Sequence, residues 1–297
     1  MSDLTRPGAL PLRPLTTGEL LDAAVVLLRA RPFRLIGVGG VLAVIEQALL
    51  FPLRRLADQD ISLFPATGRL SEFGWLLLAG FGTEALIIAI IGGIAAADGG
   101  RALLGAAAPP RPAPRPVSVG VIAVTAMLVA AAATALPFLV VLEPLQDGGF
   151  VAAGLLVAVL WPLPYGLIGM AAPAAVIEQR GPGSALLRSI RLASRDTLRA
   201  VWIRLLGWLS WMLIRLALIL ATIALVELIF TSPSATVDNL VLAGAAVLVN
   251  AVAYPVLGCL DVMLLLEGRM RTEGLDIMLR RTLTRGVATE ATLRAPR

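Results

Sequence analysis

Acidic and arginine side chains are the candidates for chemistry in this sequence. It contains no histidine and one cysteine, Cys259, which excludes serine-histidine triads, cysteine-histidine dyads and histidine-based or cysteine-rich zinc sites. A P-loop and a G-x-S-x-G nucleophile elbow are also absent, so any use of ATP would require a partner chain. We therefore predict no catalytic residue, no cofactor and no metal, and expect a protein that is not an enzyme.

Four polar residues lie deep within apolar stretches of the sequence: Glu46, Glu84, Arg215 and Asn250. At the rise of a helix each lies about 15 Å from the start of its stretch, so all four share one depth. Such buried charges are costly, and they pair with one another or mark functional sites. We expect Arg215 to pair with Glu84, Glu46 or both, with Asn250 satisfying the remaining lone pairs. Two interpretations stay open, a salt bridge that specifies helix packing and a polar site or proton path.

A second group of arginines recurs at steps of 3, 4 and 4 residues: Arg188, Arg191, Arg195 and Arg199. On a helix over 184–199 these side chains fall within an arc of roughly 80°. A helix of this kind lies at a membrane surface with its arginines toward phosphate groups. We expect this arginine arc to bind anionic lipid head groups or an acidic surface of a membrane or cytoplasmic partner.

Transmembrane helices must position both groups. The 297 residues are 58% hydrophobic and only 15% charged, with a mean hydropathy of +0.87, which is too apolar for one soluble core. Six stretches reach the roughly 20 residues that cross a bilayer, and they lack the alternation of a lipid-facing barrel. They are 35–53, 74–97, 118–142, 150–177, 205–230 and 240–266. The predicted fold class is an all-α polytopic membrane bundle with six transmembrane helices and two cytoplasmic interfacial helices.

The placement of arginine predicts the orientation. Most arginines lie in the N-terminal segment 1–34, in the second and fourth connections and in the tail 267–297. The connections on the other side contain only Arg54, Arg55 and Arg69. By the positive-inside rule both termini are cytoplasmic. All 25 basic residues are arginine, a bias typical of a GC-rich bacterial genome and no sign of nucleic-acid binding, so we expect a bacterial plasma-membrane protein.

Helix signals refine this outline. Thr16 and Glu19 form a capping box for the first interfacial helix, which ends before Pro32. The second interfacial helix is the one over 184–199. Three prolines fall in the fourth transmembrane stretch and should bend or interrupt it, namely Pro162, Pro164 and Pro173. The proline-rich segment 106–116 is expected to be an extended linker.

Three motifs resemble a family of bacterial six-helix proteins named the glycerophosphoryl diester phosphodiesterase membrane domain. Pro11 to Pro32, PLRPLTTGELLDAAVVLLRARP, is similar to the family's P-L-R-P-L-x-x-G-E-I-L-D-A-A opening. Ala171 to Arg199 is similar to its A-P-A-V-V-x-E-x-x-G-x-x-x-A-L-x-R-S-x-x-L pattern, and Arg269 to Leu279 matches its R-x-R-x-E-G-L-D ending. The family's Tyr-x-Asp-Leu before that ending is absent here, and only the acid, Glu267, remains.

The resemblance implies a polytopic membrane protein and says little about activity. Glycerophosphodiesterase enzymes, to which the family name refers, use a soluble barrel with catalytic histidines, and this chain has no histidine. The resemblance therefore implies a non-enzymatic accessory or scaffold component of the cell membrane. The alternative is a permease-type transporter subunit that uses a partner ATPase, because the helix over 184–199 stands where a coupling helix would contact it.

Overall fold

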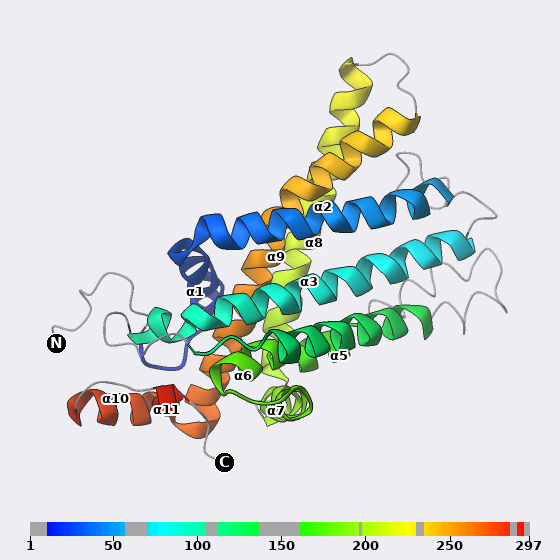
Figure 1. Ribbon diagram of the computed structural model, residues 1–297. Helices are drawn as coiled ribbons and strands as arrows, with labels where there is room; N and C mark the ends of the chain where they lie inside the picture. The colour runs from blue at the N-terminus through cyan, green and yellow to red at the C-terminus, as the bar shows by residue number, and fades with distance from the viewer. Residues whose placement is uncertain are drawn as a thin grey trace.

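The computed structural model describes residues 11–56, 70–104, 112–136, 161–195, 198–229, 235–285 and 290–293. Every element within these ranges is a helix (Figure 1). The labelled helices are α1 (Thr17–Ala30), α2 (Pro32–Leu56), α3 (Leu70–Leu104), α5 (Pro162–Ile168), α6 (Ala171–Ile177), α7 (Pro182–Arg195), α8 (Arg199–Ile229), α9 (Ala235–Glu273), α10 (Leu275–Arg285) and α11 (Glu290–Leu293). One further helix, Pro116–Leu136, lies between α3 and α5 in the chain. The predicted all-α class is confirmed.

Five helices are long and apolar enough to cross a membrane. They are Pro32–Leu56, Gly74–Leu104, Pro116–Leu136, Arg199–Val226 and Asn239–Glu273. Several helices extend beyond the predicted apolar stretches: α8 begins six residues before 205, and α9 continues seven residues past 266. Part of the predicted fourth stretch, 150–160, lies outside the described residues.

The rest of that fourth stretch is interrupted, as its prolines predict. Helix α5 ends at Ile168 and α6 begins at Ala171. Pro173 lies in α6, and its ring would clash with the carbonyl four residues earlier, that of Gly169. The break falls at that point. A Cβ at Gly169 would lie only 2.4 Å from Cζ of Arg204, so a glycine here lets the guanidinium of α8 approach the break.

Helix α1 begins with the predicted capping box but packs into the bundle. The backbone N–H of Glu19 donates to Oγ1 of Thr16, and the N–H of Thr16 donates to Oε2 of Glu19 at 2.8 Å. Its buried side chains are Leu20, Ala23, Ala24, Leu27 and Leu28. Helix α1 packs against α9 and α3. The predicted interfacial helix is therefore a docked element of the helical core.

Helix α9 is the central element of the bundle, since it packs against α1, α2, α3 and α8. Figure 1 shows α8 and α9 side by side, crossing α2 and α3 and extending beyond α2 at the top of the view. Small residues permit these crossings. A Cβ on Gly258 of α9 would lie 2.8 Å from the backbone nitrogen of Gly92 in α3. Close backbone approach of this kind is typical of packed transmembrane helices.

The contact between α2 and α9 gives a first prediction. Gly39→Ala would place a Cβ 2.8 Å from Cγ of Pro255 and 2.9 Å from the carbonyl oxygen of Ala251. Neither a proline ring nor a backbone oxygen moves easily, so we expect a loss of about 1–3 kcal/mol in the free energy of unfolding. Gly37→Ala, on the same helix, meets nothing within 4 Å and should keep or raise the melting temperature. Equal melting temperatures of the two purified variants would contradict this packing.

Candidate functional site

Arg215 was expected to pair with Glu84, Glu46 or both, and the structure pairs it with Glu84. Nη1 and Nη2 of Arg215, on α8, donate to the two carboxylate oxygens of Glu84, on α3, at 3.0 and 3.1 Å. The indole N–H of Trp208 donates to the same carboxylate at 3.1 Å. The pair is largely enclosed, with exposed side-chain fractions of 14% for Arg215 and 5% for Glu84. A bidentate pair of this kind fixes both the distance and the rotation of the two helices.

Glu46 is held by uncharged donors instead. Its carboxylate accepts hydrogen bonds from the hydroxyl groups of Tyr254, at 2.6 Å, and Thr83, at 3.1 Å. The side-chain amides of Asn250, at 3.2 Å, and Gln47, at 3.4 Å, also donate to it. Asn250 was expected to satisfy the lone pairs left over by the pairing of Arg215. It satisfies a lone pair of Glu46, the carboxylate that Arg215 does not pair with. Within the described ranges no ion pair joins Glu46 to Arg215, whose guanidinium is directed to Glu84 instead.

Tyr254 connects the two halves of this polar layer. Its hydroxyl bonds to Glu46, and its ring centroid lies 5.3 Å from Cζ of Arg215. Its position four residues after Asn250 places both side chains on one face of α9. Tyr254 was not among the predicted residues, although its spacing from Asn250 was a signal that could have found it.

A pocket of about 300 Å³ opens beside the polar layer between α2, α3, α8 and α9. Its lining includes Glu46, Glu84, Arg215 and Asn250, and also Arg54 of α2, which donates to Oε1 of Gln47. Three buried polar atoms of these residues have no hydrogen-bond partner: Nη1 of Arg54, Nε of Arg215 and Oδ1 of Asn250. The four predicted residues thus gather around one pocket.

A second enclosed ion pair was not predicted. Arg204 of α8 contacts Asp261 of α9, with Nε to Oδ1 at 2.6 Å and Nη2 to Oδ2 at 3.0 Å. Their side chains are 4% and 0% exposed. Arg204 also lies over the ring of Tyr165, 3.6 Å from Cζ to the centroid. Arg204 was expected in the connection before the fifth apolar stretch, because that stretch was predicted to start at 205.

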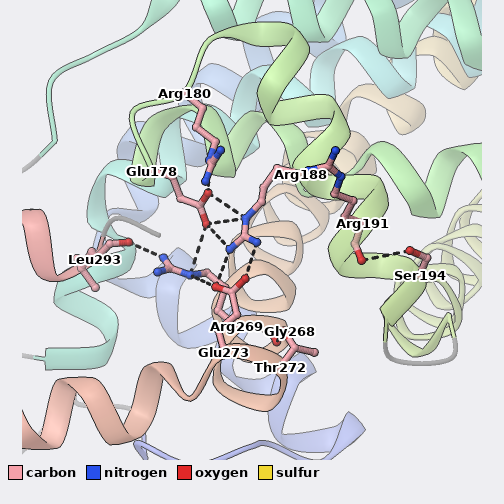
Figure 2. A network of polar contacts seen from close by, with 10 residues as sticks. All are labelled: Glu178, Arg180, Arg188, Arg191, Ser194, Gly268, Arg269, Thr272, Glu273 and Leu293. Carbon is pink, nitrogen blue, oxygen red and sulfur yellow. Dashed lines mark hydrogen bonds and ion pairs between the residues drawn. The ribbon is translucent and has the colours of Figure 1, made fainter. Parts of the chain in front are cut away.

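The arginine arc does not form one surface. Arg199 begins α8, separate from α7, and donates to Glu267 at 2.7 Å and to the carbonyl of Leu15 at 3.0 Å. Arg188 lies among carboxylates (Figure 2), with hydrogen bonds to both Glu178 and Glu273. Only Arg191 and Arg195 of the four are exposed. The prediction of a four-arginine binding surface is therefore corrected, because internal carboxylates already satisfy two of its members.

Figure 2 shows an ion-pair cluster made of Glu178, Arg180, Arg188, Arg269 and Glu273. Glu178 follows α6 and accepts from Arg180 and Arg188, while Arg269 and Glu273 come from the end of α9. Nη1 of Arg269 also donates to the carbonyl of Leu293 in α11. Burial alone lowers the pKa of Arg188, but the hydrogen bonds that Arg188 donates to Glu273 and Glu178 outweigh burial and raise that pKa. The cluster joins α6, α7, α9 and α11.

Comparisons with known proteins add no relative. No family model, curated protein or solved structure matches the chain. The resemblance described above therefore rests on its three sequence motifs alone.

The enclosed pair of Arg215 and Glu84 gives a second prediction. Arg215→Gln leaves the carboxylate of Glu84 without its counter-charge, and we expect a loss of about 3–5 kcal/mol in the free energy of unfolding. Adding Glu84→Gln removes the stranded charge and should restore part of that loss. The control is Arg34→Gln, which removes an exposed arginine and should change stability by less than about 1 kcal/mol. A double variant less stable than Arg215→Gln would argue against the pair, as measured by unfolding in detergent.

Proposed function

We propose that this chain is a non-enzymatic, multi-pass protein of the bacterial cytoplasmic membrane that serves as an accessory or scaffold component. The observation that carries the proposal is the ion-pair cluster of Glu178, Arg180, Arg188, Arg269 and Glu273. It fastens elements far apart in the sequence to one another at the end of α9. A base of this kind, in which every charged side chain lies against an opposite charge, suits a surface that holds a partner in one orientation.

The proposed topology has six spans with both termini in the cytoplasm. Five helices of sufficient length support it, and the shorter apolar segment Leu163–Ile177, which contains most of α5 and all of α6, belongs to the proposed sixth crossing. The excess of arginine near α1, α7 and α10 supports the orientation. The same arginines, with Arg191 and Arg195 exposed on α7, would favour anionic lipid head groups at that surface.

Cysteine labelling tests this topology. Leu56, at the end of α2, is 63% exposed, and Gly183, near the start of α7, has open space where a Cβ would lie. An impermeant maleimide should label Leu56→Cys in intact spheroplasts and Gly183→Cys only after permeabilisation. The parent chain is the control, since Cys259 is fully buried. Labelling of Gly183→Cys but not Leu56→Cys in intact spheroplasts would reverse the orientation.

The exposed face of α7 is the proposed contact surface for a partner. It presents Leu187, 55% exposed, and Ile190, 38% exposed, together with Arg191 and Arg195. An apolar centre beside basic residues fits a protein partner with an acidic rim. This face also favours the second candidate, a permease-type subunit, because α7 lies between the apolar helices α6 and α8, where a coupling helix would contact an ATPase.

A photo-crosslinking residue at position 187 in the full chain distinguishes the two candidates. An ATPase subunit crosslinked there would support the permease, whereas an enzyme or cell-envelope factor would support the scaffold. Arg191→Glu should reduce the crosslinked product several-fold, because it places a negative charge against an acidic rim. Arg281→Glu makes the same change on the exposed side of α10 and should leave the product unchanged. Absence of any product that depends on Arg191 would contradict both candidates.

A further inference from the structure

The pocket between α2, α3, α8 and α9 has apolar walls and a polar floor. Leu50, Leu77, Leu218, Ile219 and Val249 are among its apolar lining residues. The floor is the polar layer of Glu46, Glu84, Arg215, Asn250 and Tyr254. At about 300 Å³ it lies at the lower end of the range found for small-molecule sites. Apolar walls with a few converging polar groups are the usual composition of such a site.

The charges that line this pocket sum to zero. Arg215 is paired with Glu84, and Arg54 is connected to Glu46 through the side chain of Gln47. A ligand with a charged head group would leave one charge without a counter-charge among apolar side chains, which is costly. The pocket therefore favours an uncharged head group.

Arg54 reaches into the pocket although it stands near the end of α2. Its Nη2 donates to Gln47, seven residues back toward the middle of the helix. An arginine near the end of a transmembrane helix ordinarily extends outward to the polar interface. The inward direction places a guanidinium donor at the side of the pocket.

Three buried atoms of the lining residues define what such a head group must offer. Nη1 of Arg54 and Nε of Arg215 are donors without an acceptor, and Oδ1 of Asn250 is an acceptor without a donor. Asn250 is only 6% exposed. A buried polar group without a partner is unfavourable. A hydroxyl group can accept from a guanidinium and donate to the amide oxygen at once.

We propose that this pocket binds an uncharged single-chain amphiphile that carries a hydroxyl head group. The hydroxyl lies against Oδ1 of Asn250 and Nη1 of Arg54, and the chain lies along the leucine-rich walls. Water would satisfy the same atoms at the floor, but the walls offer it no partners. The site is separate from the proposed partner surface on α7, so either proposal can fail alone.

Photo-labelling of the full chain in lipid nanodiscs tests the site. The probe is a 12-carbon primary alcohol with a diazirine in its chain, and the labelled peptides should come from α2, α3, α8 or α9 at the pocket. Chain-matched competitors separate the chemistries: dodecanol, dodecyl methyl ether, dodecanoate and dodecylamine. We expect dodecanol to compete about tenfold better than the ether, which cannot donate, and than both charged compounds. Equal competition by dodecylamine or dodecanoate, or labelling spread over the outer surface, would overturn the proposal.

Variants locate the binding contacts. Ala246→Phe adds a ring to a lining residue without changing charge, and it should abolish competable labelling while the melting temperature stays near the parent's. Arg54→Gln should weaken competition by dodecanol about tenfold. Its matched control is Arg55→Gln, because Arg55 is exposed at the end of the same helix and is not among the pocket residues. Labelling that Ala246→Phe leaves unchanged, or equal effects of the two arginine variants, would also overturn it.

Discussion

The arrangement of this protein depends on the cost of placing arginine among apolar side chains. Three arginines with little exposure each lie against a carboxylate: Arg215 on Glu84, Arg204 on Asp261 and Arg269 on Glu273. Leaving one partner of such a contact buried and alone costs several kcal/mol, more than most single packing contacts contribute. The two pairs formed by α8 therefore restrict how that helix can rotate against α3 and α9.

Helix α9 is the element that meets this requirement at every level. Asn250 and Tyr254 face the polar layer, Asp261 faces Arg204, and Glu267 and Glu273 face the arginines near its end. Because all of these residues belong to one helix, a small rotation of α9 would disturb the polar layer, the pair with Arg204 and the ion pairs near its end together. Glycines where α9 crosses α2 and α3 allow the helix backbones to approach closely, so that the side chains of Asn250 and Tyr254 can reach their partner on α2. Packing and charge neutralisation thus specify the same position of α9.

The depth of the polar layer could be predicted from the sequence, but its pairing could not. Depth follows from the rise per residue and the ends of apolar stretches, which are local properties. Whether Arg215 meets Glu84 or Glu46 depends on how each helix is rotated, and that is decided by distant packing such as the contact of Gly39 with Pro255. The same limit applies to the arginine arc. Periodicity identified Arg188, but it could not identify the partner of Arg188, Glu273, which lies 85 residues away in the sequence. Arg204 was missed through an error in one helix boundary.

The two interpretations of the polar layer apply to different parts of it. Arg215 and Glu84 neutralise each other with two parallel hydrogen bonds, which is the arrangement that helix packing requires. Glu46 is different, since uncharged donors from α2, α3 and α9 hold it and it contributes no ion pair to the packing of the described helices. Residues that packing alone selected would be apolar at this depth, because a carboxylate with its donors is more costly to bury than a leucine. Glu46 instead serves the pocket beside it, because its negative charge balances that of Arg54 there. Glu46 also accepts from the side-chain amide nitrogen of Asn250, and Oδ1 of Asn250 is left without a partner.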